Sequence, residues 1–286
     1  MTVATRTNLE DVNSLTDALD KFNYEVQPMQ LIRADGKSVE THKATVRVDN
    51  GLQLGIVGTG YSIVQMSDAV GMLKTIVSST QGARLKSATI FDGGRLCRLS
   101  ALVGEFDING KFGRDTVQKI VTVGNSFDGS SYYEILFEEN RKVCSNGMRR
   151  NVKTSSVKLR HTGDTDAKQH EALRIMGMAE KHFAEFEQMC NQLANQIIDR
   201  KLVDGLIATV VGDLESTKAQ NIAAEIENLI GNGIDTHGTT RWDALNAVTE
   251  YYDHKSVKDD EKRLASSLIG NGMNKKIKAM EYLLHA

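Results

Sequence analysis

The most chemically distinctive part of this chain is a basic segment between residues 140 and 163. It contains seven arginines and lysines together with His161, and no aspartate or glutamate. The seven cations are Arg141, Lys142, Arg149, Arg150, Lys153, Lys158 and Arg160. Because the whole chain has a formal net charge of −2 and this segment contributes +7, the rest of the chain carries −9. A basic segment on an otherwise acidic protein is typical of a surface that binds a polyanion.

Aromatic side chains precede the basic segment and add a second kind of chemistry. Only 6% of the residues are aromatic, yet Phe127, Tyr132, Tyr133 and Phe137 lie within one short stretch. Aromatic rings stack on nucleic-acid bases, and arginine binds phosphate with a planar fork of N–H donors. Together they predict a single-stranded nucleic-acid interface in which the cations contact phosphates and Tyr132 or Tyr133 stacks on bases.

Two alternatives to this interface remain open. In the first, the cations coat a solvated strand and turn and pair with acidic helices, an arrangement that contributes little to stability because surface ion pairs are weak. In the second, they dock on the acidic surface of an enzyme that the chain modulates.

Residue patterns typical of enzymes are weak or missing. The sequence GTG at residues 58–60 lacks the third glycine of a dinucleotide-binding loop and predicts a tight turn or bulge. No GxxxxGK[ST] phosphate loop is present. Cys144 with His161 or His237 could be a nucleophile and base, but chance pairs of this kind are common, and we expect Cys144 to be packed. The sequence therefore predicts a binding protein rather than an enzyme, with no cofactor.

Length and composition are typical of a globular protein. The 286 residues are 40% hydrophobic and 25% charged, enough for one large core or two smaller ones. Cys97, Cys144 and Cys190 are widely spaced, which predicts reduced thiols and no zinc or other metal site. The sequence shows neither a signal-peptide pattern nor an apolar run long enough to span a membrane, so we expect a cytoplasmic location and no membrane partner.

Hydrophobic periodicity and turn residues predict the elements that position the basic segment. Alternating patterns over residues 26–64 predict β-hairpins, and residues 67–78 predict a helix capped by Ser67 and Asp68. Residues 83–145 contain alternating segments separated by DGG, ING and DGS turns, which predicts an antiparallel meander. Beyond residue 165 the period becomes helical. Strands followed by helices predict an α+β fold.

The same patterns predict three regions. Residues 1–25 are polar and predict an N-terminal arm. Residues 26–163 predict an antiparallel β-rich domain with one packed helix, and residues 164–286 a helical region, either separate or packed on the β-rich domain as one unit.

The only tryptophan, Trp242, lies just before a helix predicted over residues 244–252. Thr239 or Thr240 is a suitable N-cap, with Asp243 as its capping partner. We expect Trp242 to anchor the helix in the core, because large aromatic side chains are mostly buried. The alternative is a contact surface that includes the aromatic and cationic cluster within residues 251–255.

Three stretches, taken together, resemble a known family. They are residues 125–130 (NSFDGS), residues 141–148 (RKVCSNGM) and residues 238–254, which contain GTTRW and NAVTEY. In this order they are similar to phage/plasmid-like proteins described as a domain of unknown function and linked to lateral gene transfer. The resemblance spans roughly residues 50–255. The resemblance implies that the protein belongs to a mobile DNA element, and it identifies no catalytic residues.

The order of elements adds a second resemblance, at the level of fold. A helix, an antiparallel meander and further helices are similar to the β-β-β-α core of Rad52-like single-strand annealing proteins, which form rings with a basic groove for single-stranded DNA. Together the resemblances imply a phage or plasmid protein that binds single-stranded DNA as a homo-oligomer in annealing, recombination or replication. The protein-binding alternative, in the same setting, is a factor that modulates a host or phage enzyme.

Overall fold

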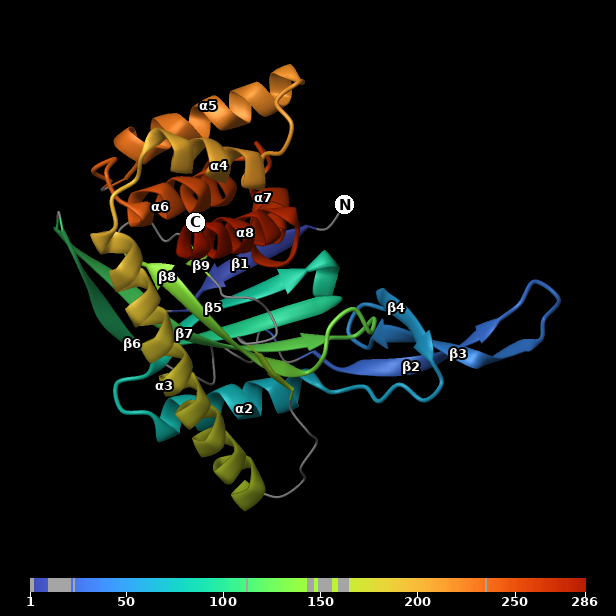
Figure 1. The fold of residues 1–286 in the computed structure, drawn as a ribbon. Helices are drawn as coiled ribbons and strands as arrows, with labels where there is room; N and C mark the ends of the chain where they lie inside the picture. The colour runs from blue at the N-terminus through green and yellow to red at the C-terminus, as the bar shows by residue number, and fades with distance from the viewer. Residues whose placement is uncertain are drawn as a thin grey trace.

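The computed structural model describes residues 3–9, 22, 24–111, 113–142, 147–148, 156–158, 165–234 and 236–286. These residues form two antiparallel sheets and a C-terminal group of helices (Figure 1). The α+β fold expected from the sequence is confirmed.

The larger sheet has the strand order β1-β5-β6-β7-β8-β10, and β9 also pairs with β8. Every neighbouring pair is antiparallel. The expected meander is thus confirmed as the run from β5 to β8. The strands are β1, Ala4–Asn8; β5, Arg84–Phe91; β6, Leu96–Gly110; β7, Gly113–Ser126; β8, Glu134–Arg141; β9, Gly147–Met148; and β10, Ser156–Lys158.

β1 belongs to the region expected to be an N-terminal arm. It pairs with β5 from Ala4, opposite Phe91, to Asn8, opposite Ser87. Ala4 is 1% exposed, and Tyr24 is buried as well. The described part of this region is therefore built into the sheet and core, because its apolar residues find partners that are distant in the sequence.

The smaller sheet contains β2, Val26–Ile32; β3, Ser38–Arg47; and β4, Gln53–Gly58, in that order. It confirms the hairpins expected over residues 26–64 and projects away from the body of the molecule (Figure 1). Its base is tied to the larger sheet by Thr45, whose hydroxyl donates to the backbone oxygen of Phe127 at 2.6 Å. Met29, Ala44 and Ile56 lie opposite one another across its three strands.

Two helices, α2, Met66–Ser79, and α3, Thr165–Asn195, pack on one face of the larger sheet (Figure 1). The helix expected over residues 67–78 is confirmed as α2. Its N-cap is Gln65 and no side chain caps it, so the expected capping by Ser67 and Asp68 is wrong. Asp68 instead lies in the first turn, where its negative charge interacts favourably with the positive end of the helix dipole. This face buries a first core that includes Leu73, Ile76, Val121, Phe137 and Phe183.

Part of the C-terminal helical region covers the end of the larger sheet where β6 joins β7, while α7 packs on β1. A second core joins Val117 of β7 to Trp242. Phe183 of α3 belongs to the first core and Phe186 to the second, so the helical region packs on the β-rich region through a shared helix. None of the described helices is long and apolar enough to cross a membrane. The C-terminal elements are α4, Arg200–Val210; α5, Thr217–Asn232; α6, Arg241–Glu250; a π-helical turn, Tyr251–Lys255; α7, Asp260–Ile269; and α8, Asn271–His285.

Candidate functional site

Two of the predicted site residues meet at the molecular surface. Tyr132, in the loop between β7 and β8, is 61% exposed. The Nζ atom of Lys158, on β10, lies 3.4 Å from the centre of the Tyr132 ring. A cation over an aromatic face is attracted by the electron density of the ring. The pair therefore joins a stacking surface to a positive charge.

Tyr133, the other aromatic residue expected to stack, is directed inwards. Its ring packs against the first core, and its hydroxyl donates to the backbone oxygen of Asp68 at 3.2 Å. Burial raises the pKa of this hydroxyl above its usual range. Tyr133 therefore holds the loop against α2, and the expectation that it stacks on bases is replaced by this structural role.

Lys142 keeps an exposed side chain at the end of β8. Its Nζ atom donates to Oε2 of Glu105 at 3.0 Å, with 56% of the lysine side chain exposed. This hydrogen bond lowers the pKa of Glu105. Because surface ion pairs are weak, Lys142 can exchange Glu105 for a phosphate. Four further predicted cations, Arg149, Arg150, Lys153 and Arg160, lie outside the described residues.

The expectation that Arg141 lies on an exposed basic surface is wrong, because this residue is 2% exposed. Its Nε atom forms an ion pair with Oδ2 of Asp115, and its Nη1 atom donates to the backbone oxygen of Ile234 at 2.7 Å. The register of β8 sets Arg141 opposite Val117 of the second core. Its side chain therefore lies between the sheet and the C-terminal helices and not in solvent.

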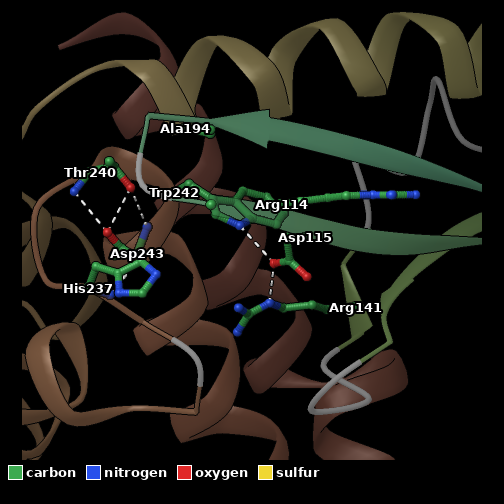
Figure 2. Close-up of a pocket in the computed structure, with 10 residues that line it drawn as sticks. Arg114, Asp115, Arg141, Ala194, His237, Thr240, Trp242 and Asp243 are labelled. Carbon is green, nitrogen blue, oxygen red and sulfur yellow. Dashed lines mark hydrogen bonds and ion pairs between the residues drawn. The ribbon is translucent and has the colours of Figure 1, made fainter.

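This buried ion pair forms one wall of a pocket where β6, β7, α3 and α6 meet (Figure 2). The pocket has a volume of about 140 Å³. It is lined by Gly110, Gly113, Arg114, Asp115, Arg141, Ala194, His237, Thr240, Trp242 and Asp243.

Asp115 makes the central contacts of the pocket wall. It is 7% exposed, and its Oδ2 atom accepts hydrogen bonds from Arg141 and, at 3.0 Å, from Nε1 of Trp242. Figure 2 shows the carboxylate between these two side chains. Its Oδ1 atom is buried and has no hydrogen-bond partner among the residues that the structure describes. Trp242 is itself 5% exposed, which confirms the expectation that it is a core anchor.

The N-terminus of α6 is fixed by a capping box that also shapes the pocket. The Thr240 hydroxyl accepts from the backbone N–H of Asp243 at 3.1 Å, and the Asp243 carboxylate accepts from the backbone N–H of Thr240 at 2.9 Å. The structure thus selects Thr240 rather than Thr239 as the N-cap. Asp243 also accepts from the backbone N–H of His237 at 3.2 Å, which holds this histidine beside the pocket.

Sequence reasoning missed Asp115. Its partner Trp242 is 127 positions away, so no local spacing connects the two residues. One signal was available: Asp115 lies two positions before Val117, and alternation along a strand sets both on the same face. A carboxylate on the core-facing side of a strand indicates a buried polar contact.

A second cavity, of about 290 Å³, lies between β1 and α7. Its acidic residues Asp253 and Asp260 form ion pairs with Lys276, at 2.5 Å, and with Arg263. Lys276 is 2% exposed, so its ammonium is buried against Asp253. The first ion pair joins α8 to the π-helical turn, and the second lies within α7, so we interpret the cluster as structural.

A protein-family model described as "Domain of unknown function (DUF932)" matches residues 53–269. The matched span runs from β4 to α7 and includes every residue that lines the pocket. It also includes Tyr132 and Lys158. No curated protein and no solved structure matches the chain.

Proposed function

Because the chain belongs to the family described as a domain of unknown function (DUF932), and that description assigns no activity, we propose a function from the residues themselves. The protein binds single-stranded nucleic acid, with DNA preferred, and acts as a homo-oligomer in annealing, recombination or replication of a phage or plasmid. The observation that carries this proposal is the exposed contact between Tyr132 and Lys158.

Tyr132 and Lys158 offer the two contacts that bind a single strand without reading its sequence. Stacking of a base on an aromatic ring contributes about 1–3 kcal/mol. A lysine that neutralises a phosphate releases bound counterions, which makes binding dependent on salt. Since the ammonium lies 3.4 Å from the ring centre, a base stacked on Tyr132 brings its own backbone near Lys158.

The register of β8 supports a path for the strand. Lys158 lies opposite Glu134 at one end of β8, and Lys142 directly follows the other end. The 8 residues of β8 span roughly 26 Å, at about 3.3 Å per residue, which is room for several nucleotides. Four further cations lie outside the described residues, and we include them in the proposal only because their segment is basic: Arg149, Arg150, Lys153 and Arg160.

Exposed apolar side chains on the smaller sheet support assembly into an oligomer. Met29 is 50% exposed and Ile56 is 53% exposed, and both lie opposite Ala44. β2 and β4 are the edges of this sheet, and edge strands offer backbone groups that another subunit can pair. We expect an assembly larger than a dimer. A light-scattering mass equal to that of one chain, across working concentrations, contradicts this part of the proposal.

The test is fluorescence anisotropy of a labelled single-stranded oligonucleotide, with the matching duplex for comparison, over a series of salt concentrations. We expect Tyr132→Ala to weaken single-strand binding on the order of tenfold, while Tyr132→Phe keeps the ring and most of the affinity. We expect Lys158→Ala to reduce the slope of log affinity against log salt by about one. Lys201→Ala, which removes an exposed charge on α4, is the matched control.

Equal affinity in the wild type and in Tyr132→Ala contradicts the stacking contact. Binding that does not change with salt contradicts phosphate recognition, and then the basic segment has another partner, such as an acidic protein surface.

A further inference from the structure

The pocket beside Trp242 lies far from the Tyr132 loop. β7 begins at Gly113, which lines the pocket, and ends at Ser126, next to that loop (Figure 1). Its 14 residues span roughly 45 Å, at about 3.3 Å per residue. A ligand in the pocket therefore occupies a site separate from the proposed strand contact.

The pocket wall contains an unmet hydrogen bond. Oδ1 of Asp115 is buried without a partner in the described part of the chain, although Oδ2 of the same carboxylate accepts from Trp242 and Arg141. Buried carboxylate oxygens are nearly always hydrogen-bonded, because desolvation without compensation is costly. The missing partner is a donor, since an ionised carboxylate only accepts.

Each charged residue that lines the pocket already has a partner. Arg141 pairs with Asp115, and Arg114 pairs with Asp107 outside the pocket. The Asp243 carboxylate accepts from backbone N–H groups at the start of α6. A charged ligand would have to compete with these partners for a neutralising charge. The arrangement favours a neutral ligand.

The shape of the pocket favours a single flat group. Its volume of about 140 Å³ is well below the roughly 300 Å³ at which pockets for whole drug-sized ligands begin. Gly110, Gly113 and Ala194 form a wall without bulky side chains. The indole of Trp242 and the imidazole of His237 add aromatic surface, against which planar groups pack well.

From these features we propose that the pocket binds a neutral, planar group that donates hydrogen bonds from an exocyclic amino group, as at the amino edge of a nucleobase, with Asp115 as the acceptor. Carboxylates accept hydrogen bonds from the cytosine amino group in the same way in protein–DNA interfaces. The group belongs either to a free nucleoside or to a base within a strand.

The intact protein carries its own probe, because Trp242 is the only tryptophan and lines the pocket. Its fluorescence is titrated with cytidine and with uridine, which differ at the position of the amino group. Guanosine and inosine form a second matched pair. We expect cytidine and guanosine to bind roughly tenfold more tightly than their partners. If a short oligocytidine changes the fluorescence and cytidine does not, the ligand is a base within a strand.

Two variants separate the acceptor from the shape of the pocket. Asp115→Asn replaces one carboxylate oxygen by a donor and should remove the preference for cytidine over uridine. Because this change removes the carboxylate that pairs with Arg141, Ala194→Leu provides a test that alters no charge. The larger side chain narrows the pocket and should weaken every ligand. Lys201→Ala is the control, since it removes an exposed charge on α4 and should leave cytidine binding unchanged.

Two results overturn the inference. In the first, the wild-type fluorescence responds equally to cytidine and uridine. In the second, it responds to no nucleoside and to no oligonucleotide. In the second case only water fills the pocket and satisfies Asp115. Both results leave the proposed strand contact at Tyr132 intact, so the two proposals fail independently.

Discussion

Replacement of Trp242 by alanine tests how the two halves of the fold are joined. The side chain is 5% exposed and belongs to the second core, and its Nε1 atom donates to Asp115 at 3.0 Å. Alanine removes the indole from the space between β7 and α6. It also removes one of the hydrogen bonds that the buried carboxylate accepts.

The two losses set the expected magnitude. Truncation of a buried tryptophan to alanine typically costs about 3–5 kcal/mol, through lost burial and the cavity that remains. Loss of a hydrogen bond to a charged group typically costs about 1.5–3 kcal/mol. The terms do not add fully, because water that enters the cavity can hydrogen-bond to Asp115. We therefore expect Trp242→Ala to lower the free energy of unfolding by about 3–5 kcal/mol and Trp242→Phe, which keeps most of the ring, by about half as much.

The assay is urea denaturation followed by far-ultraviolet circular dichroism, since the variants have no tryptophan to report by fluorescence. All proteins are compared at one concentration, because an oligomer unfolds in a concentration-dependent way. Tyr132→Ala, at a residue 61% exposed, is the control and should change stability by no more than about 0.5 kcal/mol. A Trp242→Ala variant that unfolds at the same urea concentration as the wild type, but binds nucleic acid poorly, refutes the reasoning. In that case residues 237–254 form a recognition surface.

Two further predictions concern buried polar groups. In a Cys144→Ser variant, the folded protein should not react with a thiol reagent up to about pH 9. Burial raises the pKa of Cys97 to about 12 and that of Cys190 well above its usual value, so both thiols stay protonated. Fast labelling of the folded protein without denaturant contradicts this prediction. Lys276→Met should lower the free energy of unfolding by about 3 kcal/mol, because it removes the ammonium that pairs with the Asp253 side chain, which is 7% exposed. The double variant Lys276→Met, Asp253→Leu should recover most of the lost free energy of unfolding. If Lys276→Met alone is as stable as the wild type, Lys276 and Asp253 are not coupled and the prediction is wrong.

Local patterns in the sequence determined the elements of this fold. Residues 67–78 predicted a helix, and α2 runs over Met66–Ser79. The turns between alternating segments predicted the meander of β5 to β8, and Thr240 was one of two expected caps for α6. These features depend on neighbours a few positions apart, through side-chain alternation, turn geometry and capping hydrogen bonds.

Contacts between distant residues decided which charged groups reach the surface. Arg141 and Lys142 are adjacent in one basic run, yet one is 2% exposed and the other keeps an exposed side chain. Nothing in the run itself distinguishes them, because the difference arises from Asp115 on another strand and from the helices that close over that end of the sheet. The sequence by itself determined that the chain has a concentrated positive charge and an α+β fold. Only the tertiary structure decided that Arg141, Asp115 and Trp242 form a buried pocket wall, because burial of a charge depends on a partner that local sequence does not specify.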